Sequence, residues 1–166
     1  MQYILTDKAP KPGCYSQAVA VKCGDHTHLY LSGQTGNVPG VEGEPVIDGG
    51  VGPQTTQTLK NILAVVRAAG GDVHDIVELK VFLKDSNGGG YKQLQELGRK
   101  WSRETFGAAY EEFFKQYARS SAFGNLPART TVWVPEVPLE FPTENTLVEI
   151  TAKAVIPNIV RHTAAF

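Results

Sequence analysis

Apolar and polar residues alternate in several short stretches of this chain, a pattern typical of strands with one buried face. The alternation on either side of the turn sequence CGDH predicts a hairpin of residues 18–22 and 27–32. A clearer alternation in residues 75–85 (DIVELKVFLKD) predicts a half-buried strand. Two further strands are predicted at residues 130–134 and 146–156. The apolar side of the third stretch consists of Val77, Leu79, Val81 and Leu83.

Two other regions follow the helical period. Residues 54–69 form an amphipathic helix that begins after Pro53 and ends at a Gly-Gly pair. Residues 91–117 are mostly helical, and Gly107 is expected to divide them into two helices. The apolar stripe of the first helix is Leu59, Ile62, Leu63 and Val66, and that of the later region is Leu94, Leu97 and Trp101.

The order of elements is strand, strand, helix, strand, helical region, strand, strand, with a Gly- and Pro-rich loop at residues 33–53. This order predicts an α+β fold with a mixed, largely antiparallel sheet and two helices packed on one face. No predicted element remains to cover the other face of the sheet. We therefore expect a closed homo-oligomer that buries this face.

Composition narrows the possible partners. The chain has 166 residues, which fits a single domain, and a net charge of −1. Its basic residues are scattered, which argues against a nucleic-acid partner. The sequence has no signal peptide and no run of about 20 apolar residues, so we expect no membrane span. These features predict a cytoplasmic protein, with an organelle matrix as the open alternative.

The few potential metal ligands do not form a recognisable site. Two cysteines, Cys14 and Cys23, are too few for a cysteine-rich zinc site, and His26 and His28 lack further ligands nearby. No phosphate-binding loop is present either. We therefore expect no metal and no cofactor.

One cation stands out in the segment NLPARTTVWVPEV, where Arg129 precedes a run that otherwise reads as a strand. Taken alone, Arg129 is either a solvated charge at the edge of a strand or a fixed anchor for an anion.

Seven segments resemble the RidA/YjgF family and occur in that family's order. Together they cover most of the chain, and jointly they are specific. The segments are GCYSQAV, LYLSGQTG, QTTQTLKNILAVVRAAGG, VELKVFLKD, YEEFF, LPARTTV and LVEITAKAV.

The resemblance implies a homotrimer of the chorismate-mutase-like α+β type, with sites in clefts between subunits. It also implies hydrolysis of reactive enamines and 2-imino acids to 2-oxo acids and ammonia. The expected partner is therefore a small imino or oxo acid. Other members of the family are described as endoribonucleases or translation inhibitors, or as dedicated deaminases, and a shared fold does not choose among these activities.

The resemblance also assigns roles to individual residues. Arg129 resembles the family's anchor for the substrate carboxylate, which a planar guanidinium grips through two parallel hydrogen bonds. Glu149 resembles the acid that handles water or the departing nitrogen, although a solvent-facing carboxylate or a partner of an arginine is the alternative. Tyr15 resembles the tyrosine that closes over the substrate, with packing at the subunit interface as the alternative.

Three further residues are expected to contact substrate. Ser32 and Gly33 resemble a loop where the backbone approaches the ligand, although a tight turn explains them equally well. Thr131 stands where many members have cysteine, and its backbone N–H is expected to contact the carboxylate.

The chain departs from the family pattern in two ways. Cys14 replaces a proline before Tyr15, which leaves the N-terminal loop less rigid. Two insertions are expected within the single domain of residues 1–166, at about 86–105 and 135–145. These departures leave the choice of substrate open.

Two alternatives from other functional classes remain at this stage. The first is an endoribonuclease or translation inhibitor, which requires a basic groove that the charge balance does not favour. The second is a non-catalytic trimer that senses a small carboxylate through Arg129.

Overall fold

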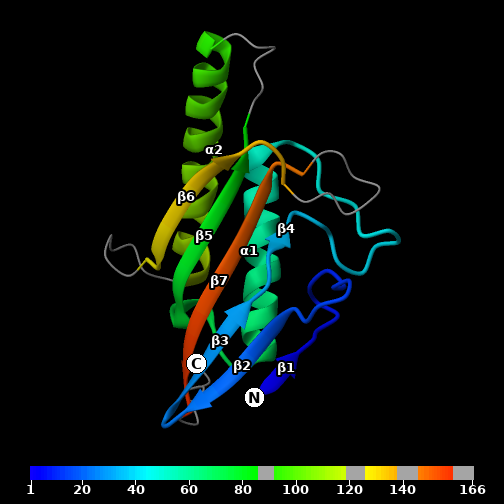
Figure 1. Cartoon of the computed structure of the whole chain (residues 1–166), viewed down its shortest axis with the longest axis vertical. Helices are drawn as coiled ribbons and strands as arrows, with labels where there is room; N and C mark the ends of the chain where they lie inside the picture. Colours follow the sequence, from blue (N-terminus) through cyan, green and yellow to red (C-terminus); the bar gives the residue numbers. More distant parts are fainter. Residues whose placement is uncertain (86–91, 119–125, 138–145, 159–166) are drawn as a thin grey trace.

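The computed structural model describes residues 1–85, 92–118, 126–137 and 146–158 of the chain. These residues form one sheet and two long helices, α1 (Val51–Ala68) and α2 (Lys92–Ala118). Both helices lie on the same side of the sheet (Figure 1), as the sequence predicts. The strands are β1 (Gln2–Ile4), β2 (Ala18–Cys23), β3 (His26–Leu31), β4 (Gln34–Thr35), β5 (Ile76–Lys84), β6 (Ala128–Val134) and β7 (Val148–Pro157).

The sheet is mixed and mostly antiparallel, which confirms the predicted fold class. The strand order is β1-β2-β3-β7-β5-β6, and the short β4 also pairs with β7. Only β5 and β6 run parallel among the paired strands described. Because β7 lies between β3 and β5, the last strand joins the N-terminal hairpin to the rest of the sheet.

The core lies between the sheet and the two helices. Alternate residues of β5 and β7 are buried on this side, and α2 contributes a cluster of aromatic rings. The opposite face of the sheet is covered by no other described element (Figure 1). The buried aromatic residues of α2 are Phe106, Tyr110, Phe113 and Phe114.

Three local expectations were wrong. Val77 is 43% exposed, because an irregularity in the β5–β7 ladder between Ile76 and Glu78 turns Ile76 to the core instead. α2 continues through Gly107 without a break, because nothing at this position forces the chain out of the helix. The loop of residues 33–53 contains the short strand β4 and an isolated bridge between Asn37 and Val46.

The boundaries of the remaining elements differ from the predictions by a few residues. α1 begins at Val51 rather than after Pro53, and the strand β1 lies in a segment that the sequence left unassigned. Leu97 and Trp101 of the predicted stripe are exposed, because this end of α2 extends past the sheet (Figure 1). Parts of both expected insertions, residues 86–91 and 138–145, lie outside the described residues, so the insertions stay predictions.

Candidate functional site

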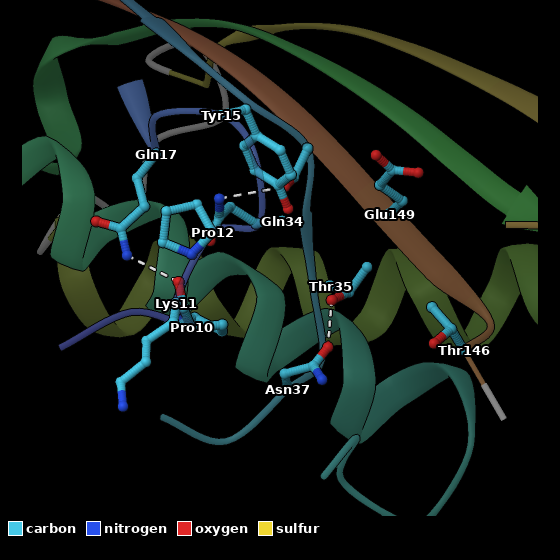
Figure 2. A pocket seen from close by; sticks show the side chains of 11 residues that line it. Pro10, Lys11, Pro12, Tyr15, Gln17, Gln34, Thr35, Asn37, Thr146 and Glu149 are labelled. Atoms are coloured by element: carbon cyan, nitrogen blue, oxygen red, sulfur yellow. Dashed lines mark hydrogen bonds between the residues drawn. The ribbon is translucent and has the colours of Figure 1, made fainter. Parts of the chain in front are cut away.

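A small cavity lies where the N-terminal segment, β4 and the start of β7 meet (Figure 2). Its volume within this one chain is about 60 Å³. Its walls are Pro10, Lys11, Pro12, Tyr15, Gln17, Gly33, Gln34, Thr35, Asn37, Thr146 and Glu149. Of the residues predicted to act in a site, Tyr15, Gly33 and Glu149 therefore lie together.

Glu149 is the acidic group of this cavity. It lies on β7 opposite Thr35 of β4 and Phe82 of β5. Its side chain is partly buried, and this burial raises the pKa of the carboxyl group above its ordinary value. No described residue forms a hydrogen bond or an ion pair with the carboxylate that would offset the effect. A carboxyl group with a raised pKa is suited to exchanging protons near neutral pH.

Gly33 leaves the space that the Glu149 carboxylate occupies. A Cβ atom built on Gly33 would lie 1.8 Å from Glu149 Oε1, far inside non-bonded contact. Any larger residue at this position would therefore displace the Glu149 carboxylate from its present place. The expected alternative, a tight turn after a strand, does not by itself explain the glycine.

The N-terminal wall of the cavity is fixed by Gln17, which is almost fully buried. Its side-chain oxygen accepts a hydrogen bond from Thr6 N at 2.7 Å, and its amide nitrogen donates to Thr6 O, Ala9 O and Pro10 O. Ser32 attaches the same segment to β3, because its hydroxyl donates to Ser16 O at 2.7 Å. Ser32 therefore acts on the structure of the wall and is not part of the lining. Tyr15, which is 49% exposed, stands at the mouth.

The β4 wall is fixed from α1. The buried Asn61 donates to Thr35 O at 2.9 Å and to Asn37 O at 2.8 Å. The Thr35 hydroxyl in turn donates to the side-chain oxygen of Asn37. This network holds β4 against β7 beside Glu149, so a polar position of α1 supports the geometry of the cavity.

Arg129 and Thr131 lie elsewhere, on β6 at the edge of the sheet, and neither lines the cavity. Arg129 is opposite Leu79, which is fully buried on the helix side, so Arg129 points to the helix side as well. Glu149 points to the other face, because it is opposite Phe82. Within one chain, the predicted anchor and the predicted acid therefore do not converge.

The Arg129 side chain is exposed, but its guanidinium packs against two aromatic rings. Its Cζ atom lies 4.6 Å from the centre of the Tyr110 ring and 5.2 Å from that of Phe106, both on α2. No acidic side chain among the described residues forms an ion pair with it. Arg129 is therefore an exposed charge on the edge strand whose guanidinium lies over two rings, and its role as an anchor for an anion stays a prediction.

Several residues of the cavity were not predicted from the sequence. Gln17, Gln34 and Thr35 stand inside motifs that carry the family resemblance, and that was the one signal that could have identified them. Thr146 begins a predicted strand, but only the folded structure brings it and Asn37 to the cavity.

Three further observations concern metal ligands, membrane-spanning helices and thiols. Within the described parts of the chain, no group of three or more His, Cys, Asp and Glu side chains is arranged to hold a metal ion. Among the same residues, no helix is both long and apolar enough to cross a membrane. Cys14 and Cys23 are exposed, and both are free thiols.

Fold and site together define a small α+β domain with a small cavity beside the central strand β7, lined by the carboxylate of Glu149. The family model described as Endoribonuclease L-PSP matches residues 6–156. The chain therefore belongs to the RidA/YjgF family, as its motifs suggest.

Individual relatives are similar over nearly the whole chain. The rat 2-iminobutanoate/2-iminopropanoate deaminase is 35% identical over 153 residues, which is 92% of this chain and 88% of the relative. Among solved structures, the Escherichia coli YjgF gene product has a TM-score of 0.65 at 33% identity, covering 93% of this chain and 98% of the other. E. coli TdcF with bound serine has a TM-score of 0.65 at 28% identity, with the same coverage.

Proposed function

We propose that this protein hydrolyses reactive 2-imino acids, and the enamines that interconvert with them, to 2-oxo acids and ammonia. The observation that carries the proposal is the half-buried Glu149 in this small cavity. The rat relative named for this activity and the serine bound to TdcF support a small amino-acid-like ligand.

The reaction needs proton transfers at two moments, and Glu149 is suited to both. Water adds to the C=N bond, its oxygen bonding to carbon 2 while the nitrogen gains a proton. The C–N bond then breaks, the nitrogen leaves as ammonia, and the new hydroxyl group loses its proton to become the oxo group. Glu149 takes a proton from the attacking water and passes it to the imine nitrogen, and it then takes the proton of the new hydroxyl group and passes it to the departing amine. No covalent nucleophile is needed.

We further propose that Arg129 binds the substrate carboxylate from a neighbouring copy of the chain in a homotrimer. Two observations support this arrangement. No described element covers the face of the sheet opposite the helices, and Arg129 points away from Glu149 within its own chain. In this arrangement Tyr15 and the backbone at Gly33 close one wall, while Arg129 and the backbone N–H of Thr131 hold the carboxylate.

The experiment generates 2-imino acids in situ with an amino-acid oxidase and traps the remaining imine with semicarbazide. The wild-type protein should lower the yield of trapped imine. Arg129→Lys keeps the charge but loses the planar fork, so it should reduce the rate by about tenfold or more. Arg103→Lys, an exposed residue on α2, is the matched control and should hydrolyse like the wild type.

Failure of the folded protein to accelerate loss of any small or bulky imino acid would overturn the proposal. Binding of a small carboxylate without turnover would then favour the non-catalytic sensor. Cleavage of RNA that survives Arg129→Lys would favour the activity in the description of the family model.

A further inference from the structure

The support of Arg129 by aromatic rings bears on how the protein holds an anion. The rings of Tyr110 and Phe106 are 3% and 1% exposed, so they form a fixed surface beneath the guanidinium. Cζ distances of 4.6 and 5.2 Å to the ring centres lie within the range of a cation–π interaction.

The position of these rings is determined by the rest of α2. Residues 106, 110 and 114 follow one another at intervals of four along the helix, so their rings stack on one side. The centre of the Tyr110 ring lies 5.8 Å from that of Phe106 and 4.8 Å from that of Phe114. A buried row of rings of this kind leaves Tyr110 little freedom to reorient.

A guanidinium that stacks on an aromatic ring keeps more of its N–H donors available than one that is paired with a carboxylate. An acidic partner would occupy the guanidinium N–H donors and cancel the charge. A ring contacts the flat face of the guanidinium and leaves the in-plane N–H groups for a second partner. No described residue forms an ion pair with Arg129, so neither its charge nor its fork is used by such a contact within the described chain.

We propose that Tyr110, with Phe106, is a positioning residue for Arg129, and that the stacked rings orient the guanidinium fork toward the substrate carboxylate. The inference rests on the anchoring role that the proposed function gives to Arg129. It adds that the rings of α2 determine the direction of the Arg129 guanidinium, and through it the affinity of the protein for planar carboxylates.

The test measures binding of 2-oxobutanoate, a stable 2-oxo acid, to the full-length protein by calorimetry. Tyr110→Leu removes the ring, so the Kd should rise by roughly tenfold, the scale of a partly desolvated cation–π contact. Tyr110→Phe keeps the ring and should bind within about twofold of the wild type. In imine hydrolysis, Tyr110→Leu should raise KM while kcat changes little, because the lost interaction exists before and during the reaction.

Phe113→Leu is the matched control. Phe113 is as buried as Tyr110 and its ring packs edge-on against Phe114, the last ring of the row, but Arg129 does not stack on it. This variant should lose thermal stability as Tyr110→Leu does and keep the wild-type Kd. If Tyr110→Leu fails to fold, Phe106→Leu takes its place, with a smaller expected rise in Kd.

The outcomes separate this inference from the proposed function. Equal weakening by Tyr110→Leu and Phe113→Leu, or no weakening by Tyr110→Leu, overturns the positioning role. If Arg129→Lys leaves 2-oxobutanoate binding unchanged, the anchoring role itself fails. If Arg129→Lys abolishes binding and Tyr110→Leu does not weaken it, the anchor stands and only the positioning role is overturned.

Discussion

Glu149 occupies a place where its charged form is disfavoured. Its side chain is partly buried, and no described residue compensates the charge by a hydrogen bond or an ion pair. The neighbouring Gly33 contributes no side chain, which allows the carboxyl group to approach the backbone closely. An acid kept where ionisation costs stability is typical of a group retained for proton transfer.

This cost predicts a pH-dependent gain in stability for Glu149→Gln. In the wild type the carboxyl pKa is raised in the folded state, with burial as the cause. As pH rises above 4.5, the ordinary pKa of a glutamate side chain, the unfolded chain ionises first, and the folded wild type loses stability relative to the glutamine variant. The variant should therefore have the higher Tm at neutral pH, and the difference should close as pH falls toward that value.

Thermal unfolding between acid and neutral pH measures this effect. Glu42→Gln, at an exposed site in the loop after β4, is the control and should show no comparable gap. Imine hydrolysis by Glu149→Gln should meanwhile fall by roughly a hundredfold or more, since a group that transfers protons is lost. A glutamine variant that is less stable at neutral pH would contradict the assignment of burial as the dominant effect.

At this scale the sequence located three of the eleven residues that line the cavity. Tyr15, Gly33 and Glu149 stand in motifs whose residue types report a chemical role, so they could be named in advance. Asn61 could not, because a polar residue on an amphipathic helix is usually exposed. Here its two hydrogen bonds to β4 carbonyl groups explain its burial.

At the scale of elements, α2 is the clearest departure from expectation. Glycine lowers helix propensity, so Gly107 was expected to end a helix, but α2 runs unbroken from Lys92 to Ala118. The flanking aromatic residues pack against the core on both sides of the glycine, and this packing outweighs a local preference of about 1 kcal/mol.

Gly107→Ala should therefore stabilise the protein. A Cβ atom at this position would meet no atom within 4 Å, and the backbone is already helical. Alanine should add about 0.5–1 kcal/mol to the free energy of unfolding, or roughly 1–4 °C in Tm for a chain of this size. Chemical and thermal denaturation both measure it.

Gly71→Ala provides the contrast, because its Cβ would lie 2.9 Å from side-chain atoms of Ile156 and Val66. That variant should lose stability while Gly107→Ala gains it. Loss of stability in both variants would mean that α2 is less regular at Gly107 in solution.

Periodicity predicted the long elements and missed the short ones for a physical reason. α1, β5 and β7 each contain enough residues to show a repeat. β1 has three residues and β4 has two, which is too few for any pattern. β1 forms because it pairs with β2, and β4 forms because it pairs with β7. These pairings exist only in the folded sheet and leave no pattern in the short strands themselves.

At the scale of the whole molecule, the predicted site is divided. Glu149 and Arg129 point to opposite faces of one sheet. Their strands, β7 and β6, are separated by β5 in the strand order. The sheet face that carries Glu149 also exposes Tyr30 and Val132, large apolar side chains that a second copy would cover. A site shared between copies explains both facts at once.

A shared site predicts complementation between two inactive variants. Arg129→Lys keeps Glu149, and Glu149→Gln keeps Arg129. In a mixed trimer, a cleft is intact when its Arg129 comes from one variant and its Glu149 from the other. In a closed ring of three identical interfaces every mixed trimer has one intact cleft of three, so the purified mixed oligomers should show about a third of the wild-type activity. The two chains are co-expressed with different affinity tags, and the mixed oligomers are purified through both tags before imine hydrolysis is measured.

The control is a mixture of the two variants that are purified separately and do not exchange subunits. This mixture should hydrolyse the imine as slowly as either variant alone. If the co-expressed oligomers are equally slow, Arg129 and Glu149 must act within the same chain. β6 or the segment around Glu149 would then have to reorient by more than a side-chain rotation, because the sheet register places the two residues on opposite faces. Recovery of activity would instead mean that each cleft contains Arg129 of one chain and Glu149 of another.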